Sequence, residues 1–358
     1  MFSNIYPLVP LVQLNIRWLY SPHHSRSGQG QKLQLGTSVT RIQLATRNWD
    51  HVIPLALGDV PQEHYAFERR EITPDLWSEP GLDGGETSFS RYIRARAAGD
   101  YSVTALPVFI MRGFRHRCII TRSESPLESA ADLRGARIGL TGWVDTGNTW
   151  TRAVLRQAGV GIADAEWHVG RLTAAHPIQD RIGAIAVPDN VQPCENEEPM
   201  VDMLLRGALD AVMTPFMPPG FYEPGSPLRT LFRDSRAAEA DYYRTTGYVP
   251  GIHLLAVQTR VLEANPEAAQ ELVDLFETSR IVSDSRRGKL QDITPWQNEA
   301  LAETTRIFGA NWMATGWKHN QLMINGLQTE MVAQGLLASQ LADDVLFPFK
   351  PEPAEVLS

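Results

Sequence analysis

The alternation of strand-like and helix-like segments is the feature that most restricts how this 358-residue chain can fold. Short apolar runs at residues 137–140 and 211–214 each stand next to a stretch whose apolar residues have helical spacing. A last strand is predicted over residues 249–258. Strands that alternate with helices are typical of an α/β fold. After the last strand the pattern is helical, and we predict helices over residues 265–285, 295–308 and 318–334.

The length and the order of these segments predict two lobes joined by two crossings of the chain. We assign residues 35–128 and 251–347 to lobe one and residues 129–250 to lobe two. Helix N-termini of both lobes would then face a ligand held between them. The predicted fold is an α/β two-lobed clamshell with a helical C-terminal tail, in which residues 348–358 are frayed.

Residues 1–34 precede the first predicted strand, and we expect them to form a disordered N-terminal extension. The segment 5–20 is apolar, but two prolines and an arginine interrupt it. No basic residue precedes this segment and no small-residue cleavage site follows it, so it fits neither a secretory signal nor a membrane span. We therefore expect a cytoplasmic protein.

Charge and cysteine content argue against several classes of function. The formal net charge is −8, and the two cysteines, Cys118 and Cys194, form no CxxC motif. An acidic chain without a basic stripe is not expected to bind nucleic acid or an anionic membrane. The sequence also has neither a Walker loop nor a GxGxxG turn after a strand. We therefore expect no metal and no cofactor, and we leave a homo-oligomer open.

The stretch LPVFIMRGFRHRCIIT, residues 106–121, gathers charged groups in a short turn. We predict a strand on either side, with Arg112, Arg115 and His116 in the turn between them. A guanidinium matches a carboxylate bidentately, and a histidine can donate a proton near neutral pH. The turn is therefore a candidate site for an anion, and a solvated turn with scattered arginines is the alternative.

Two predicted helix starts and several strand ends supply further candidates. GGETSFSRY and TGWVDTGNTW each lead into a helix whose free N–H groups can be capped or can bind an anion. Residues just past the C-terminal end of a strand face the ligand crevice of an open α/β sheet. His253 lies inside the last predicted strand, where a core histidine is the alternative. The candidate substrate-binding residues from these segments are Asp50, Ser88, Ser90, Arg91, Thr146, Asn148, Thr149 and Thr214.

Three segments of the chain carry a resemblance to a known family. They are ALPVFIMRGFRHRCIITR, DLRGARIGLTGW with WTRAVLRQ, and YRTTGYVPGIHLLAVQTRVLEAN. In this order they resemble the 4,5-dihydroxyphthalate decarboxylase family, and the similarity extends over most of residues 38–347. The resemblance implies a fold like that of type II periplasmic binding proteins. One departure is at Asp50, which is followed by His51 where the family has an Asp-Arg pair.

The resemblance implies a lyase that removes CO2 from a small hydroxylated aromatic carboxylate. Such a reaction needs a proton donor, a cation that holds a carboxylate, and a dry cavity. We predict His116 as the general acid, His253 as the group that acts on the ring hydroxyl, and Arg112 or Arg115 as the carboxylate clamp. Two alternatives stay open. One is a non-catalytic solute-binding protein for a small aromatic or carboxylate ligand. The other, an iron-dependent pyrimidine-precursor synthase, would need a cluster of histidines and cysteines that the sequence does not contain.

Overall fold

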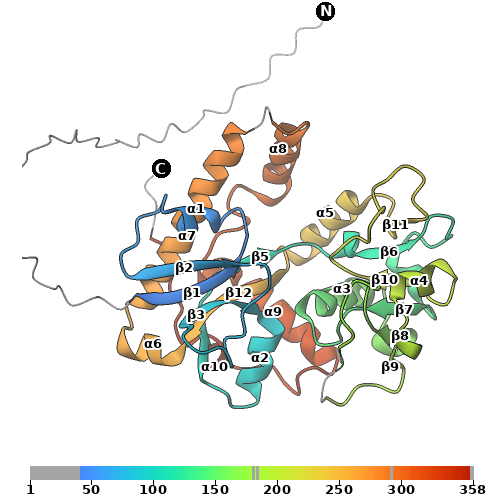
Figure 1. The fold of residues 1–358 in the computed structure, drawn as a ribbon, viewed down its shortest axis with the longest axis horizontal. Helices are drawn as coiled ribbons and strands as arrows, with labels where there is room; N and C mark the ends of the chain where they lie inside the picture. Colours follow the sequence, from blue (N-terminus) through green and yellow to red (C-terminus); the bar gives the residue numbers. More distant parts are fainter. Residues whose placement is uncertain (1–40, 180–181, 183–184, 291–292, 355–358) are drawn as a thin grey trace, which may run out of the picture. The chain divides into compact units, whose positions relative to one another are not determined.

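Two mixed β-sheets organise the computed structural model, which describes residues 41–179, 182, 185–290 and 293–354 (Figure 1). Both sheets lie in the unit Arg41–Pro353. The predicted extension at residues 1–34 and the last residues of the predicted frayed tail lie outside the described residues. No helix in the described part of the chain is both long enough and apolar enough to cross a membrane.

Sheet one has six strands among the described residues, in the order β2-β1-β3-β12-β4, with β5 paired to β12. β1 runs parallel to β2 and β3, whereas β12 is antiparallel to β3, β4 and β5. The sequence GIHLLAVQ of β12 is almost continuously apolar because both faces of the sheet are covered. The strands are β1 (Ile42–Arg47), β2 (Tyr65–Arg70), β3 (Gly84–Ser88), β4 (Val103–Ala105), β5 (Met111–Arg112) and β12 (Gly251–Gln258).

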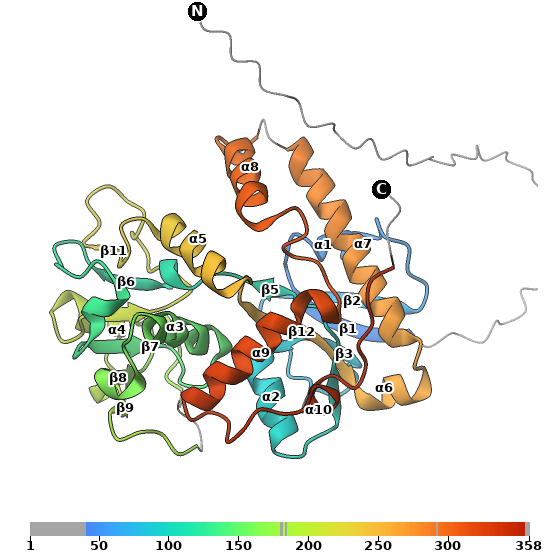
Figure 2. The same cartoon turned by 180° about the vertical axis from the view of Figure 1, so that it is seen from behind.

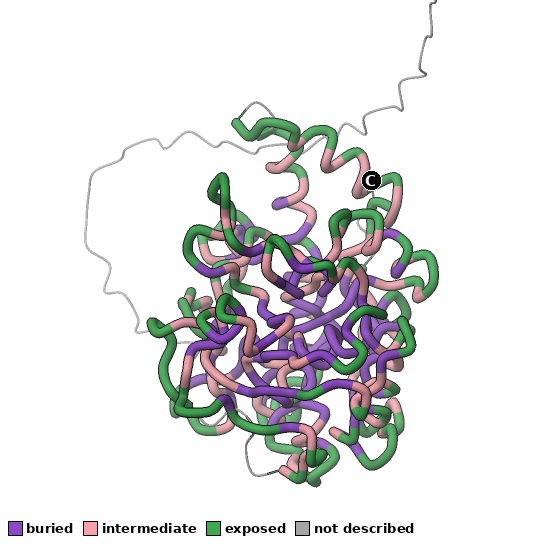
Figure 3. Tube along the Cα trace, turned by 90° about the vertical axis from the view of Figure 1, so that its right-hand side faces the viewer, coloured by how far each residue is buried: buried purple, intermediate pink, exposed green. Residues whose placement is uncertain are grey.

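Helices cover each face of sheet one, and the period-two alternation of β12 divides its side chains between them. Leu254 and Ala256 pack in a core with residues of α2, α9 and α10, whereas Leu255 and Val257 pack in a core with residues of α1 and α7. Burial is therefore concentrated in the strands and in the inner faces of the helices (Figure 3). The helices are α1 (Ile53–Leu57), α2 (Phe89–Ala97), α6 (Thr259–Ala264), α7 (Ala268–Lys289), α8 (Gln297–Phe308), α9 (Trp317–Ala333) and α10 (Asp343–Leu346). The helices that follow β12 confirm the predicted helical tail.

Sheet two has six strands in the described part of the chain, in the order β11-β6-β10-β7-β8-β9. β10, β7, β8 and β9 are parallel, and β6 is antiparallel to both β10 and β11. Residues of α3 pack in the core on one face and residues of α4 in the core on the other. The elements are β6 (Ile119–Arg122), β7 (Arg137–Leu140), β8 (Glu166–Val169), β9 (Val191–Pro193), β10 (Ala211–Met213), β11 (Leu228–Thr230), α3 (Thr146–Gln157), α4 (Met200–Leu205) and α5 (Ser235–Thr246).

The stretch predicted as a strand–turn–strand is instead the connection between the two sheets. β5 pairs with β12 in sheet one, whereas β6 pairs with β10 and β11 in sheet two. The residues between them end in a short 3-10 helix, His116–Cys118, and Gly113 N donates to Pro250 O. The local hairpin does not form because β12, far away in sequence, is the better partner for β5. The chain thus enters sheet two by Ile119, earlier than the predicted boundary at residue 128.

Hydrogen bonds between α3 and α9 also join the two sheets, and the two helices lie side by side (Figure 2). The buried Arg152 donates from Nε to Oε1 of Gln334 at 2.8 Å, and Nε2 of Gln334 donates to the carbonyl oxygen of Thr149 at 2.9 Å. Arg156 forms an ion pair with Glu330 at 2.9 Å. Buried polar groups that are satisfied in this way restrict the relative placement of the elements that carry them.

Two glycines open β3 because the neighbouring strands leave no room for a side chain. A Cβ atom at Gly84 would lie 2.6 Å from Cγ1 of Val257, and one at Gly85 would lie 2.1 Å from the carbonyl oxygen of Ala45. Gly85 also has a φ of +152°, which L-residues with a side chain rarely adopt. The sequence GGETS therefore brings the backbone of β3 close to both neighbours, and the next residue, Glu86, follows directly.

Candidate functional site

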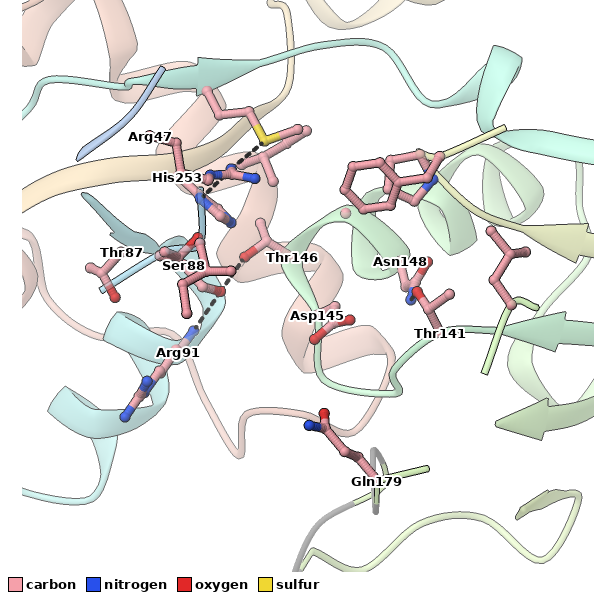
Figure 4. Close-up of a pocket in the computed structure, with 18 of the residues that line it drawn as sticks. Arg47, Thr87, Ser88, Arg91, Thr141, Asp145, Thr146, Asn148, Gln179 and His253 are labelled. Atoms are coloured by element: carbon pink, nitrogen blue, oxygen red, sulfur yellow. Dashed lines mark hydrogen bonds between the residues drawn. The ribbon is translucent and has the colours of Figure 1, made fainter. Parts of the chain in front are cut away.

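A cavity of about 660 Å³ lies where the carboxyl ends of strands from both sheets meet. This volume is in the usual range for a small-molecule site. Arg47 and His253 lie on one side of it, Thr141 and Asn148 lie on the other, and Thr146 lies between them (Figure 4). Other lining residues are apolar, and they include Ile72, Met111, Leu172, Pro215, Phe216 and Ile252.

A carboxylate–histidine pair lies at the sheet-one side of the cavity. Nδ1 of His253 is 2.6 Å from Oε1 of Glu86, and the Glu86 side chain is completely buried. In the register of β3 and β12, His253 is opposite Ser88 and Leu255 is opposite Glu86, so Glu86 and His253 are diagonal neighbours on one face. His253 lines the cavity and its side chain is 16% exposed, whereas Glu86 does not line it.

Arg47 and Trp49 hold the Glu86 carboxylate in place. Arg47, the last residue of β1, donates to Oε1 from Nε at 3.0 Å and from Nη2 at 2.8 Å, and its backbone N–H donates to Oε2 at 2.9 Å. Nε1 of Trp49 also donates to Oε2, at 2.9 Å. Burial acts to raise the pKa of the Glu86 carboxyl, but hydrogen bonds and charges from His253 and Arg47 together lower this pKa to about 2. Glu86 is therefore ionised at neutral pH.

With Nδ1 directed at Glu86, the second ring nitrogen of His253 remains for a ligand. Among the described residues, Nε2 of His253 has no hydrogen-bond partner. A carboxylate hydrogen-bonded to one ring nitrogen holds the orientation of the ring. The geometry therefore suits a proton donor or acceptor directed at the cavity.

Arg115 provides a buried cation on the sheet-two side. The residue lines the cavity, is 4% exposed and donates from Nε to Oγ1 of Thr151 at 3.3 Å. Burial lowers the pKa of its guanidinium, and no carboxylate of the described residues forms an ion pair with it. Its Nη2 lies against Gly147 in the first turn of α3, where a Cβ atom would be only 2.8 Å away. A buried guanidinium beside a helix N-terminus is a good environment for an anion.

The two predicted helix starts contact each other beside the cavity. Oγ of Ser88 and Oγ1 of Thr146 are 2.9 Å apart, and the backbone N–H of Ser90 donates to Oγ1 of Thr146 at 2.9 Å. Ser90 also donates from Oγ to the carbonyl oxygen of Val144 at 2.7 Å. Ser88 and Thr146 line the cavity, and Ser90 lies behind them. These hydroxyls therefore join α2 to α3.

Asn148 also lines the cavity, and its amide has a defined orientation. Nδ2 donates to the carbonyl oxygen of Gly142 at 2.8 Å and approaches Oγ1 of Thr141 at 3.4 Å. The reverse orientation would place Oδ1 against a carbonyl oxygen, so the amide oxygen is directed elsewhere. Within the described residues, Oδ1 is buried and has no partner.

His116, predicted as the general acid, lies away from the cavity. Its ring packs between Phe232 and Tyr242, with centroid distances of 5.2 and 5.4 Å, and it is not among the lining residues. Burial and the charge of Arg117 lower the pKa of His116 to about 4. The imidazole is therefore neutral at pH 7, and a neutral imidazole is a poor proton donor. The short 3-10 helix turns the ring into an aromatic core.

Arg112, the other predicted clamp, is directed away from the cavity as well. It donates to Oδ1 of Asn320 and to the carbonyl oxygen of Ala314, and it lies 5.0 Å from the ring of Phe109. Burial lowers the pKa of Arg112 to about 9. Arg112 belongs to β5 while Arg115 follows the turn, so the two guanidiniums leave the connection in different directions.

Four other predicted ligand-binding residues have structural partners. The Asp50 side chain is 73% exposed and its carboxylate lies 3.5 Å from Arg287, away from the cavity. Thr149 donates to the carbonyl oxygen of Asp145, and Thr214 exchanges hydrogen bonds with the backbone of Phe216. Arg91 lines the cavity, but it forms an ion pair with Asp75 at 2.7 Å and its guanidinium lies 4.6 Å from the ring centroid of Trp77.

Sequence reasoning missed Glu86. The strand-end argument that selected Asp50 and Thr214 also places Arg47 and Phe216 at the ligand crevice, although neither is among the candidate substrate-binding residues. Glu86 is a lone carboxylate in a buried strand, which is unusual unless it is paired. In the part of the chain that the structure describes, no three His, Cys, Asp or Glu side chains are grouped as metal ligands.

Sequence comparison finds relatives along most of the chain. The family described as "NMT1/THI5 like" matches residues 87–277. A 4,5-dihydroxyphthalate decarboxylase of Comamonas testosteroni is 28% identical over 324 residues, which is 87% of this chain and 97% of the relative. Another of the same name, from Pseudomonas putida, is 30% identical over 213 residues, which is 58% of this chain and 83% of the relative.

Structure comparison finds the same fold in a binding protein and in an enzyme. The periplasmic aliphatic sulphonate binding protein SsuA from Escherichia coli matches with a TM-score of 0.51 and 14% identity, over 90% of this chain and 96% of that one. The desulfurization enzyme DSZB matches with a TM-score of 0.50 and 15% identity, over 87% of this chain and 97% of that one. The α/β fold with a periplasmic-binding-protein-like arrangement is thus confirmed, and this arrangement is used both for binding and for catalysis.

Proposed function

Because this chain belongs to the 4,5-dihydroxyphthalate decarboxylase family, we propose that it removes CO2 without oxidation from a hydroxylated aromatic carboxylic acid. The observation that carries the proposal is the Glu86–His253 pair at the edge of a cavity of about 660 Å³. The cavity is large enough for a substrate with one aromatic ring.

In the proposed reaction, His253 is the proton donor. The imidazolium transfers the proton on Nε2 to the ring carbon that bears the carboxylate, while Nδ1–H stays hydrogen-bonded to Glu86. The bond between this carbon and the carboxylate then breaks, its electron pair returns to the ring, and CO2 leaves. His253 regains its proton from water before the next turnover. Glu86 contacts His253, Arg47 and Trp49 and does not line the cavity, so it acts as a positioning residue.

Arg115 is proposed to hold a carboxylate of the substrate. Its guanidinium is buried, lines the cavity and lies against the first turn of α3, so an anion there would meet both a cation and a helix N-terminus. The lining by Met111, Ile252 and Leu172 lowers the local polarity. Loss of the carboxylate charge as CO2 is favoured where water is excluded.

The proposal is tested by incubating the protein with a panel of hydroxylated aromatic acids and detecting the loss of CO2 by mass spectrometry. The expected result is release of CO2 from at least one acid that carries a hydroxyl ortho or para to the carboxylate. The variant that tests the role of His253 is His253→Gln, which keeps a polar side chain but cannot carry the proton. Release that is unchanged in this variant would contradict the proposed mechanism.

The second candidate function is binding of a small aromatic or carboxylate solute without chemistry. It is favoured only by the likeness in fold to a sulphonate-binding protein, and a fold does not determine function. In the assay above, an acid that is retained by the protein and recovered unchanged would support this candidate.

A further inference from the structure

Phe216 is a large apolar side chain that the fold leaves exposed at the cavity. The residue follows β10 at the carboxyl end of sheet two, is 59% exposed and lines the cavity. Other phenylalanines of the described residues, such as Phe109 and Phe89, are buried in the core. An exposed aromatic side chain at the wall of a cavity is a common contact for a ligand.

The backbone of Phe216 is held by a buried side chain. Oγ1 of Thr214 donates to the carbonyl oxygen of Phe216 at 2.9 Å and accepts from its N–H at 3.0 Å. Thr214 is 0% exposed, so the side chain that makes this double contact is itself buried. Thr214, which the sequence indicated as a ligand-binding residue, therefore fixes the residue that reaches the cavity.

Sheet one also contributes apolar side chains to the wall of the same cavity. Met111 of β5 and Ile252 of β12 line it, beside the polar groups of Arg47 and His253. A flat ligand in the cavity would therefore meet apolar atoms from both sheets, and its polar substituents would be left for His253 and Arg115.

We infer that Phe216 is a specificity-determining residue, whose ring packs against the aromatic ring of the bound acid and selects it over a saturated acid of similar size. The inference deepens the proposed function and rests on it for the class of ligand. Ring–ring packing adds to simple apolar burial because of the quadrupoles of the two rings, and this part is lost when the ligand ring is saturated.

The test compares the binding of two probes, phthalate and cis-cyclohexane-1,2-dicarboxylate, by isothermal titration calorimetry. In Phe216→Ala we expect the Kd for phthalate to rise about tenfold and that for the saturated acid by about threefold or less. Phe216→Tyr should keep the preference for phthalate. The matched control is Tyr222→Ala, because Tyr222 is 85% exposed on the same stretch but does not line the cavity. It should change neither Kd.

Thr214→Val tests the positioning role of the threonine. This change keeps the shape of the side chain but removes both hydrogen bonds to Phe216, so the preference for phthalate should fall in the same direction as in Phe216→Ala, by a smaller factor. In the decarboxylation assay, both variants should raise KM and leave kcat within about threefold, because neither side chain takes part in proton transfer.

Three outcomes would overturn the inference: equal weakening for both probes in Phe216→Ala, no weakening for phthalate, or no phthalate binding by the unaltered protein. The binding test does not depend on catalysis. A protein that binds phthalate through Phe216 and yet releases no CO2 from any acid would refute the proposed function and leave the role of Phe216 standing.

Discussion

Glu86 and His253 are 167 positions apart in the chain, yet Oε1 of the first lies 2.6 Å from Nδ1 of the second. They meet because β3 and β12 are adjacent and antiparallel, and because the two residues are diagonal on one face. Arg47, at the end of the neighbouring strand β1, forms an ion pair with Glu86. Three strands of sheet one thus bring together one carboxylate, one imidazole and one guanidinium.

Replacement of His253 by glutamine should lower kcat for CO2 release by a factor of about 10² to 10⁴, which is the usual contribution of a general acid. The measurement is the initial rate of CO2 release on the best acid of the panel. The control is His116→Phe, since His116 packs among aromatic rings outside the cavity, and its rate should stay within about threefold of that of the unaltered protein. A loss of less than about tenfold in His253→Gln would remove His253 from the mechanism.

Replacement of Glu86 by glutamine should make the free energy of unfolding less dependent on pH in the acid range. The pKa of Glu86 is about 2 in the folded protein against an ordinary 4.5, so the unfolded chain takes up the proton first as the pH falls. The ionised carboxylate therefore contributes stability above pH 4.5, and this contribution is lost as the pH falls towards 2. The difference in pKa corresponds to about 3 kcal/mol at neutral pH.

Urea unfolding midpoints between about pH 7 and about pH 3 provide the measurement for Glu86→Gln. The variant should be less stable at neutral pH, and the gap to the unaltered protein should narrow in acid. Glu68→Gln is the matched control, because the Glu68 side chain is 60% exposed in its ion pair with Arg70. A gap that is constant with pH would show that Glu86 does not have the low pKa described.

Replacement of Arg115 by methionine should weaken the binding of a carboxylate substrate. Loss of a charge-assisted contact of this kind is expected to raise KM by about 10- to 100-fold, with a smaller effect on kcat. Arg117→Met is the matched control, because Arg117 is two residues away, its side chain is 59% exposed, and it pairs with Glu239 outside the cavity. Equal effects of the two changes would argue against an anion site at Arg115.

Gly147→Ala should separate stability from binding. The new Cβ atom would lie 2.8 Å from Nη2 of Arg115, so the guanidinium must shift, and KM for the acid should rise about three- to tenfold. Alanine favours the helix over glycine by about 0.5–1 kcal/mol, so the melting temperature should not fall. A fall in melting temperature with an unchanged KM would mean that Arg115 does not contact the substrate.

Apolar periodicity predicts several of the strands and helices correctly, because burial of one face determines both the spacing of apolar residues and the element that forms. The strand predicted at residues 137–140 is β7, and the last predicted strand contains β12. Periodicity failed at residues 106–121, where the order of apolar and charged residues fits a local hairpin equally well. There the outcome depends on pairing with β12, which a local pattern does not contain.

The candidate site was harder to predict than the fold, for the same physical reason. Arg112 and Arg115 look alike in sequence, and only the path of the connection sends one to Asn320 and the other to the cavity. Glu86 becomes recognisable as a site residue only when the register of β3 and β12 is known. Groups whose roles depend on contacts between distant strands are not visible in the spacing of residues along one segment.

The close packing of Gly84 and Gly85 restricts which mutations this chain can accept during evolution. A slip of β3 by one residue would turn the Glu86 side chain to the opposite face of the sheet and away from His253. The contacts of the two glycines with Ala45 and Val257 admit no side chain, so a slip in one direction would force Glu86 into the space of Gly85, and a slip in the other would force Asp83 into that of Gly84. Gly84 and Gly85 thus help to fix the register of β3 between its two neighbours. Mutations there should be selected against through lost chemistry even where the protein still folds.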